Sequence, residues 1–189
     1  MKIIDTNIPE VKIIEPQVYK DERGYFYESF SDEWFRKNVC DTTFVQENQS
    51  FSYRGVLRGL HYQLPPFAQS KLVRVTKGMV YDIAVDIRKG SPTFGQYVIA
   101  LLSETNKRQL FIPRGFAHGF VTVGHDSVIF QYKVDNKYAP ECEASIRWDD
   151  PDIDIKWEVD EDYLLISEKD REAPLFKDSK LFDYNEKLY

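Results

Sequence analysis

The sequence predicts an all-β fold, either a sandwich or a barrel, on three observations. Short apolar runs of strand length recur at regular spacing, and clusters of turn residues separate them. Aromatic residues make up 15% of the chain and hydrophobic residues 42%, which is enough for a packed core. The 189 residues contain no repeat, low-complexity tract or linker, so we expect one domain over residues 1–189.

The first part of the chain predicts two strands and a helix. Val11–Val18 is rich in β-branched residues, and the turn Asp21–Gly24 follows it. Tyr25–Phe30 alternates aromatic and polar residues, as a half-buried strand does. Ser31 is a suitable N-cap for a short helix over Asp32–Asn38.

The stretch Thr43–Ser52 alternates again, and one of its faces is mostly polar. That face carries Phe44, Gln46, Asn48 and Ser50. Polar side chains are unusual in a dry core, so we expect this face to line a wet cavity.

Further strands are expected at regular spacing, with Lys77-Gly78 indicating a hairpin between two of them. The acidic segment Trp148–Asp162 is expected to lie on the surface over the sheets. Ser167 is expected to start a second short helix, with Asp170 at the capping-box position. The expected strands are Lys71–Thr76, Val80–Ile87, Tyr97–Leu102, Gln109–Pro113, Phe120–Val123 and Val128–Val134.

One stretch, Gly55–Lys71, gathers cations and a histidine between apolar residues. Arg58 and His61 stand close to glycines, where the backbone can bend or approach a ligand, and Lys71 opens the next strand. If these strands are consecutive in one small barrel, their inward side chains face a shared cavity. That cavity would hold two fixed cations and one group that titrates near neutral pH.

The overall charge and the cysteines exclude several classes of protein. The net charge of -6 argues against a general nucleic-acid binder, although local arginines can still hold one phosphorylated ligand. Cys40 and Cys142 lack metal-binding or redox spacing, and two thiols do not make a disulfide framework. The N-terminus has no apolar targeting segment, and no long apolar run occurs. We therefore expect a soluble, cytoplasmic protein without a membrane partner.

The run Pro113–His118, PRGFAH, fits the second motif of the cupin β-barrels, P-x-G-x-x-H. Metal-binding cupins also carry a His-x-His pair followed by Glu in their first motif. The corresponding place here reads His61-Tyr62-Gln63, so one ligand position is a glutamine. Two imidazoles without further ligands rarely hold a transition metal. We therefore expect a cupin-type barrel that holds no metal.

Without a metal, His61 has two interpretations. It is either a core histidine bonded to a backbone carbonyl or a general base. The nearby Arg58 and Lys71 favour the base, because a cationic neighbourhood is costly to build for structure alone. Taken singly, Tyr132 is interpreted as a core or rim tyrosine and Asp170 as a helix cap.

Long strings of the sequence connect these residues. The chain resembles, nearly end to end, the dTDP-4-dehydrorhamnose 3,5-epimerase family, a group of metal-free cupins. One departure is Gln46-Glu47-Asn48, where the family commonly has Gln-Asp-Asn, and the change keeps the charge. The strings that carry the resemblance are DERGYFYESF, TFVQENQSFS, GVLRGLHYQ, AQSKLVRVTKG, VDIRKGSPTFGQ, KRQLFIPRGFAHGF, YKVDNKYAPECEASIRWDDP and SEKDREAPL.

The resemblance implies a fold and a reaction. The fold is a double-stranded β-helix, or jelly roll, with a few short helices. The reaction inverts C3 and C5 of dTDP-4-dehydro-6-deoxyglucose beside its C4 ketone, gives dTDP-4-dehydro-L-rhamnose for dTDP-L-rhamnose synthesis, and needs no cofactor. His61 would be the base, and Asp170 would orient it. Lys71 would stand near the ketone oxygen, and Tyr132 would be the acid on the opposite face of the sugar.

The resemblance also implies a substrate site and a partner subunit. Arg23 and Arg58 would meet the diphosphate, and Tyr138 would stack on the thymine. The family is homodimeric with N-terminal strands crossing between subunits, so Arg23 and Glu28 are expected to serve the partner's site. The other residues expected to line the nucleotide-sugar site are Gln46, Glu47, Asn48, His118, Glu143 and Lys169.

Three other functions remain open at this point. A relative could invert only C3 or only C5, or act as a ketoisomerase, although His61 and Tyr132 together favour the double inversion. A metal-dependent cupin oxygenase is opposed by the missing ligands. A non-catalytic sugar-binding cupin would not need the His–Asp pair and the tyrosine.

Overall fold

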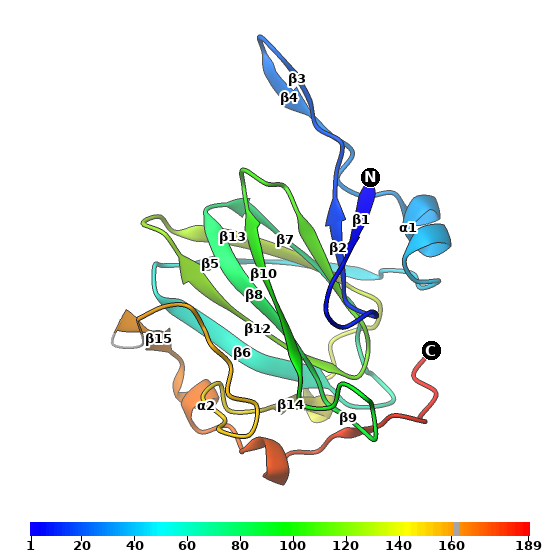
Figure 1. Ribbon diagram of the computed structural model, residues 1–189, viewed down its shortest axis with the longest axis vertical. Helices are drawn as coiled ribbons and strands as arrows, with labels where there is room; N and C mark the ends of the chain where they lie inside the picture. Colours follow the sequence, from blue (N-terminus) through cyan, green and yellow to red (C-terminus); the bar gives the residue numbers. More distant parts are fainter. Residues whose placement is uncertain (161–162) are drawn as a thin grey trace.

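The computed structural model describes residues 1–160 and 163–189. Two antiparallel sheets pack face to face in it, which confirms the predicted all-β, jelly-roll fold (Figure 1). Strands from distant parts of the chain alternate within each sheet, so most neighbours in space are far apart in the sequence.

The first sheet has six strands. The N-terminal pair β1–β2 forms one end, and β5 forms the other. In spatial order the strands are β1 (Lys2–Asp5), β2 (Lys12–Glu15), β11 (Gln109–Ile112), β7 (Lys71–Lys77), β13 (Val128–Val134) and β5 (Gln46–Ser52).

The second sheet is built around β12 and β6, with a short parallel strand, β15 (Leu165–Ile166), added beside β6. In spatial order its strands are β10 (Tyr97–Ser103), β8 (Met79–Asp86), β12 (Phe116–Val123), β6 (Val56–Gln63) and β14 (Glu143–Ser145). Two small sheets complete the strands: β3 (Tyr19–Asp21) with β4 (Gly24–Phe26), and β9 (Arg88–Lys89) with β16 (Phe182–Asp183).

The centre of the second sheet, around β12, is buried on both faces, because apolar side chains cover each of them. Its inner face packs on the first sheet, where Phe120 and Phe130 stack with ring centroids 4.3 Å apart. Its outer face is covered by the segment that follows β14, whose Ile153, Ile155 and Trp157 are buried. That segment was expected to lie on the surface over the sheets. It does cover the sheet, and its apolar side chains face inwards and are buried. Glu161 and Asp162, its last two residues, lie outside the described part of the chain.

Both predicted helices form, and the predicted serine is the N-cap of each. In α1 (Asp32–Asn38), Ser31 Oγ accepts a hydrogen bond from Trp34 N, and the buried Phe35 packs against the first sheet. In α2 (Glu168–Arg171), Ser167 caps the helix in the same way. Two 3₁₀ turns, η1 (Pro140–Cys142) and η3 (Phe176–Asp178), complete the helical elements described. Within residues 1–160 and 163–189, no helix has the length and hydropathy needed to cross a membrane.

The N-terminal hairpin β3–β4 differs from its prediction. The strand expected over Tyr25–Phe30 ends at Phe26, and every residue of β3 and β4 is exposed rather than half-buried. The hairpin stands away from the two sheets (Figure 1), and its aromatic side chains are largely exposed, although the ammonium of Lys107 lies over the Tyr25 ring, 4.1 Å from its centroid. Phe30 instead packs against Phe35 of α1, with ring centroids 6.0 Å apart.

Candidate active site

A cavity of about 330 Å³ opens between the two sheets, and polar side chains line most of it. The polar face of β5 contributes Gln46 and Asn48, which confirms the alternation predicted there. The lining residues are Gln46, Asn48, His61, Tyr62, Gln63, Gln69, Lys71, Tyr132, Tyr138 and Glu143. The cavity therefore gathers residues from β5, β6, β7, β13 and β14.

The centre of the site is a hydrogen-bonded pair, His61 and Asp170. His61 Nε2 lies 2.6 Å from Asp170 Oδ1, and the Asp170 residue is only 3% exposed. Asp170 Oδ2 also accepts a hydrogen bond from the backbone N–H of Gly59, at 3.4 Å. Burial of Asp170 opposes ionisation, but the hydrogen bond and charge of His61 outweigh it and hold the pKa of the carboxyl below its ordinary value. Asp170 is therefore an anion that can orient and stabilise a protonated imidazole.

Gly59 allows this arrangement for a local reason. Its φ of +134° is open to glycine, and a Cβ there would lie 2.6 Å from the Cα of Gly119 on the neighbouring strand β12. Strands β6 and β12 therefore approach closely at this point. The backbone N–H of Gly59 is left to bond Asp170, from two residues before the histidine.

Lys71 lies beside the histidine in the same cavity. Its Nζ donates a hydrogen bond to the backbone carbonyl of His61, at 3.3 Å. Burial lowers the pKa of Lys71 to about 8, although Asp82 and Glu143 act in the opposite direction. An ammonium group here is a fixed donor for a negatively charged oxygen in the cavity.

Tyr132 faces the cavity from the other sheet. It lies on β13 of the first sheet, whereas His61 lies on β6 of the second sheet. Burial raises the pKa of the Tyr132 phenol, while Arg58 and Asn48 lower it to a smaller extent. The phenol is therefore protonated at neutral pH and can act as an acid.

A polar group at the mouth of the cavity involves three of the predicted residues. Tyr138 donates a hydrogen bond to Glu143 at 3.2 Å, and Lys169 forms an ion pair with the same carboxylate at 2.7 Å. Tyr138 is 53% exposed, so a face of its ring is open to a planar group.

A second hollow, of about 510 Å³, adjoins the cavity and shares His61 with it. Arg58 and Lys169 line this hollow, and both are cationic. The Arg58 guanidinium is held by Ser52 Oγ at 3.2 Å and by the carbonyl of Phe51 at 3.3 Å. The arrangement suits an anionic group bound next to the cavity.

Four predicted site residues lie elsewhere. Glu47 points to the opposite face of β5 from Gln46 and Asn48, because side chains alternate along a strand, and it pairs with Lys133 at 3.0 Å. His118 was expected to line the site but is buried behind it, 3.0 Å from Asp82 Oδ2.

The other two lie in or just after the N-terminal hairpin. Arg23 pairs with Asp21 at 2.6 Å and has an 85% exposed side chain. Glu28 follows β4 and is exposed. Neither residue lines the two hollows of this chain.

Sequence reasoning did not assign to the site three residues that line the cavity, Tyr62, Gln63 and Gln69, or the buried Asp82 that acts on Lys71. Gln69 lines the cavity, and its position two residues before Lys71 was the signal that could have identified it. Asp82 is a fully buried carboxyl whose Oδ1 has no hydrogen-bond partner. Its signal was a charged residue inside the apolar strand predicted over Val80–Ile87.

No group of three or more His, Cys, Asp or Glu residues in the described ranges is arranged to hold a metal ion. Gln63, at the position of a metal ligand in other cupins, is fully engaged in the protein. Its amide donates to the carbonyls of Phe67 and Lys137, at 2.7 and 3.1 Å, and accepts from Ala139 N at 2.9 Å.

The chain is similar to proteins of known class over nearly its whole length. Residues 5–178 match the sequence model of the family described as dTDP-4-dehydrorhamnose 3,5-epimerase. The protein of that name from Sinorhizobium fredii is 53% identical over 169 residues, which are 89% of this chain and 86% of the relative. The one from Shigella flexneri is 51% identical over 183 residues, or 96% and 99% of the two chains.

A solved structure gives the same result. The dTDP-6-deoxy-D-glucose-3,5-epimerase of Legionella pneumophila, in complex with dTDP-4-keto-L-rhamnose, superposes with a TM-score of 0.93. It is 48% identical, and the superposition covers 98% of this chain and 99% of the other.

Proposed function

This chain belongs to the dTDP-4-dehydrorhamnose 3,5-epimerase family, and from that premise we propose which of its residues carry the reaction. The enzyme is an isomerase that inverts C3 and C5 of dTDP-4-dehydro-6-deoxyglucose to give dTDP-4-dehydro-L-rhamnose. The observation that carries the assignment is the placement of His61 and Tyr132. They come from different sheets and line the same cavity, as two proton-transfer groups on opposite faces of a sugar would.

His61 removes the proton. The C4 ketone makes the C–H bonds at C3 and C5 acidic, so a single imidazole can act at either carbon. With the Nε2–H assigned as the donor to Asp170, Nδ1 is the atom that accepts the proton. Asp170 fixes this tautomer and stabilises the imidazolium that forms.

Lys71 stabilises the enolate, and Tyr132 completes the inversion. Loss of the proton moves the electron pair of the C–H bond towards the C4 oxygen, where the ammonium of Lys71 offsets the negative charge. The Tyr132 phenol then donates a proton to the same carbon from the opposite face. The phenolate and the imidazolium exchange protons with solvent before the second centre reacts.

The nucleotide part of the substrate is assigned to the mouth of the cavity. Arg58 binds the diphosphate from the adjoining hollow, with Lys169 beside it. Tyr138 stacks on the thymine through its exposed ring face, and Glu143 holds the Tyr138 hydroxyl. Gln46 and Asn48, which bond each other at 2.8 Å, contact the sugar from β5.

The active enzyme is a homodimer in which the hairpin β3–β4 crosses to the partner. Tyr19, Tyr25 and Phe26 of the hairpin are 63%, 58% and 72% exposed, which is costly for three large aromatic residues in one place. Crossing would cover them and bring Arg23 and Glu28 to the partner's substrate. The two free cysteines fit a reducing compartment, which supports a cytoplasmic location.

Incubation with dTDP-4-dehydro-6-deoxyglucose in D₂O tests the function. We expect product that carries deuterium at both C3 and C5, measured by mass spectrometry and NMR. His61→Ala should abolish exchange at both carbons, because one base serves both centres. Incorporation at one carbon alone would identify a monoepimerase, and wild-type exchange in a folded His61→Ala variant would overturn the assignment of the base.

A further inference from the structure

The last residues of the chain, 179–189, contact the strand that carries His61 and the residue that precedes the strand of Lys71. We call them the C-terminal tail, and they follow the part of the chain that matches the family model. The tail begins after η3 and forms β16, which pairs in parallel with β9 through Phe182 and Arg88. Its path along the edge of the molecule is drawn in red in Figure 1.

The tail first contacts β6 at the residue next to the catalytic histidine. The Tyr62 hydroxyl donates a hydrogen bond to the carbonyl of Lys180, at 2.6 Å. Phe182 is 2% exposed, and its ring centroid lies 6.0 Å from that of Tyr62. Burial raises the pKa of Tyr62 to about 12, so its hydroxyl keeps this hydrogen bond over the working pH range.

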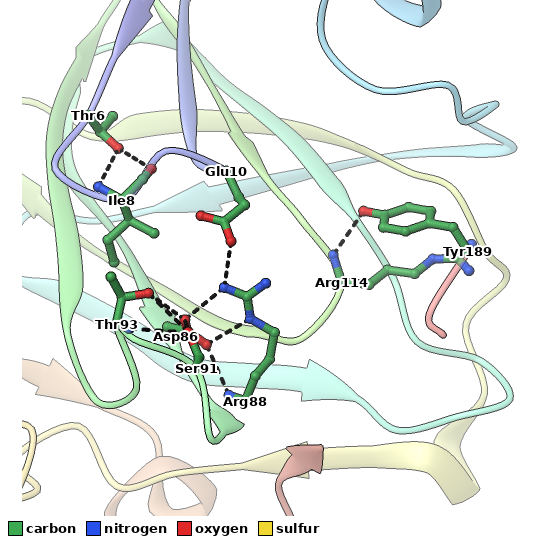
Figure 2. Close-up of polar contacts among 9 residues, drawn as sticks. All are labelled: Thr6, Ile8, Glu10, Asp86, Arg88, Ser91, Thr93, Arg114 and Tyr189. Carbon is green, nitrogen blue, oxygen red and sulfur yellow. Dashed lines mark hydrogen bonds and ion pairs between the residues drawn. The ribbon is translucent and has the colours of Figure 1, made fainter. Parts of the chain in front are cut away.

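The tail then contacts the start of β7 at the residue next to the catalytic lysine. Tyr189 Oη lies 2.6 Å from Ser70 Oγ and accepts a hydrogen bond from Arg114 N at 3.1 Å. The Arg114 guanidinium lies over the Tyr189 ring, 4.9 Å from its centroid (Figure 2). Ser70 N and Arg114 Nε both donate to the buried carboxylate of Asp135, at 2.6 and 3.2 Å.

Ion pairs and packing contacts hold the tail in place between these two contacts. Arg88 holds Asp86 at 2.7 Å and Glu10 at 3.0 Å (Figure 2), and its guanidinium lies 5.2 Å from the Tyr184 ring centroid. Leu188 packs where Gly115 has no side chain, since a Cβ there would lie 3.1 Å from Leu188 Cδ1. The tail is therefore packed against the body of the protein between its contacts with Tyr62 and Ser70.

We propose that the C-terminal tail is a clamp that positions His61 and Lys71, and that Tyr189 is the positioning residue for Lys71. The inference rests on the roles proposed above for these two residues. Tyr62 and Ser70 are each the covalent neighbour of a catalytic residue, and each is hydrogen-bonded to the tail. Among the hydrogen bonds of the tail in the described part of the chain, Tyr62 is the one partner that lines the cavity, so the tail acts through the strands.

The physical effect is on geometry and on access of water to Lys71. The titratable groups around Lys71 are Asp82 of β8, Glu143 of β14, His61 of β6, His118 of β12 and Tyr132 of β13. Loss of the Tyr189 hydroxyl removes the partner of Ser70 Oγ, while Ser70 N stays bonded to Asp135. The start of β7 is then held by fewer contacts, and water reaches the lysine more readily. Weaker burial raises the pKa of Lys71 from about 8 towards its ordinary value.

The test uses Tyr189→Phe in the full chain, with Tyr184→Phe as the matched control. Tyr189→Phe keeps the ring over Arg114 and removes only the hydroxyl, whereas Tyr184 is a tail tyrosine packed on Arg88. We expect kcat to fall roughly tenfold in Tyr189→Phe, below the 10²-fold that a 1 Å misplacement can cost. The KM should stay close to that of wild type, and the alkaline limb of the kcat profile should move to higher pH.

A second measurement does not depend on catalysis. Amide hydrogen exchange should be faster in Tyr189→Phe for the peptide that contains Ser70 and Lys71, and unchanged in Tyr184→Phe. Wild-type exchange together with a wild-type pH profile in Tyr189→Phe would overturn the clamp. Absence of epimerase activity in the wild-type chain would instead overturn the proposed function, and the exchange result would still decide whether the tail holds β7.

Discussion

His61 Nε2 lies 2.6 Å from Asp170 Oδ1, although 109 residues separate the two in the chain. The histidine lies near the end of β6, and the carboxylate comes from the short helix α2. Gly59 N donates to the other oxygen of the same carboxylate, so two groups of β6 hold Asp170 in place. The pair therefore has a preset orientation before any substrate binds.

Replacement of Asp170 by asparagine should reduce kcat by roughly 10²–10⁴-fold, the range that a positioned acid–base group contributes. The amide keeps the shape but cannot fix the tautomer or stabilise the imidazolium. The measurement is the steady-state rate with the dTDP-sugar. The exposed Asp178→Asn serves as the control, and a kcat within twofold of wild type for Asp170→Asn would contradict the role.

The same variant should change the pH dependence of stability. The folded pKa of Asp170 is depressed, so its ionisation stabilises the native state above the unfolded pKa of about 3.9. That contribution is lost as the pH falls through the folded pKa. Denaturant titrations between neutral and acid pH should show a smaller loss of unfolding free energy in Asp170→Asn than in wild type.

Lys71 should set the alkaline limit of activity. It must be protonated to stabilise the enolate, and its pKa of about 8 means that kcat falls above this pH. Lys71→Arg should lose part of the rate through altered geometry but keep its residual activity to much higher pH, because a guanidinium stays charged. The exposed Lys77→Arg on the same strand is the control. An alkaline limb at the wild-type position in Lys71→Arg would show that another group titrates.

Tyr132→Phe should separate proton removal from inversion. The ring and its packing remain, and His61 with Lys71 can still form the enolate. That enolate would be reprotonated mainly by the same histidine, which restores the original configuration. Deuterium should therefore enter recovered substrate, while inverted product falls by roughly 10²–10⁴-fold.

The readout for Tyr132→Phe is the ratio of deuterium in recovered substrate to product formed. A tyrosine that only supports the rim would lower both quantities together and leave the ratio at its wild-type value. That result would remove the acid role of Tyr132 and the two-face mechanism with it.

Activity should survive exhaustive chelation. Gln63 occupies the place of a metal ligand, and its amide is already bonded to three backbone groups. The measurement is the rate after prolonged treatment with EDTA and removal of the chelator. A reversible loss that one divalent ion restores would contradict this prediction.

Mixed dimers should show whether Arg23 serves the partner's site. Arg23→Ala and His61→Ala homodimers should each be impaired, for different reasons. A heterodimer contains one site that pairs an intact His61 with the other subunit's intact Arg23, so mixing after mild dissociation should restore activity. Mixing that restores nothing, although heterodimers are seen by native mass spectrometry, would place Arg23 outside the partner's site.

The sequence predicted the strand framework well, because alternation and turn residues are local signals. The polar face of β5 followed from Gln46 and Asn48, which alternate with exposed neighbours. The hairpin β3–β4 was predicted less well. The alternation of Tyr25–Phe30 predicts a half-buried strand, but a local pattern does not show whether the rest of the chain packs against it, and here β4 ends at Phe26 with every residue exposed.

The site itself was less accessible from local patterns. From the sequence, Asp170 was interpreted as a helix cap. In the structure Ser167 caps the helix, and the Asp170 carboxylate bonds His61 instead. Tyr132 alone had no pattern that distinguished it from a packing residue. Both roles came from the family resemblance, because contacts between β6, β13 and α2 are set by tertiary packing. His118 shows the opposite case, since its motif marks the fold while its ring is buried against Asp82.

Besides its pairing with β12, strand β6 is flanked by elements from the final third of the chain: β14, β15, α2 and the tail. During synthesis on the ribosome, His61 therefore emerges long before the groups that orient it. A nascent or prematurely terminated chain that lacks residue 170 carries the base without its carboxylate partner. With the roles proposed for His61 and Asp170, a chain that stops before residue 170 should turn over the nucleotide sugar more slowly than one that includes it.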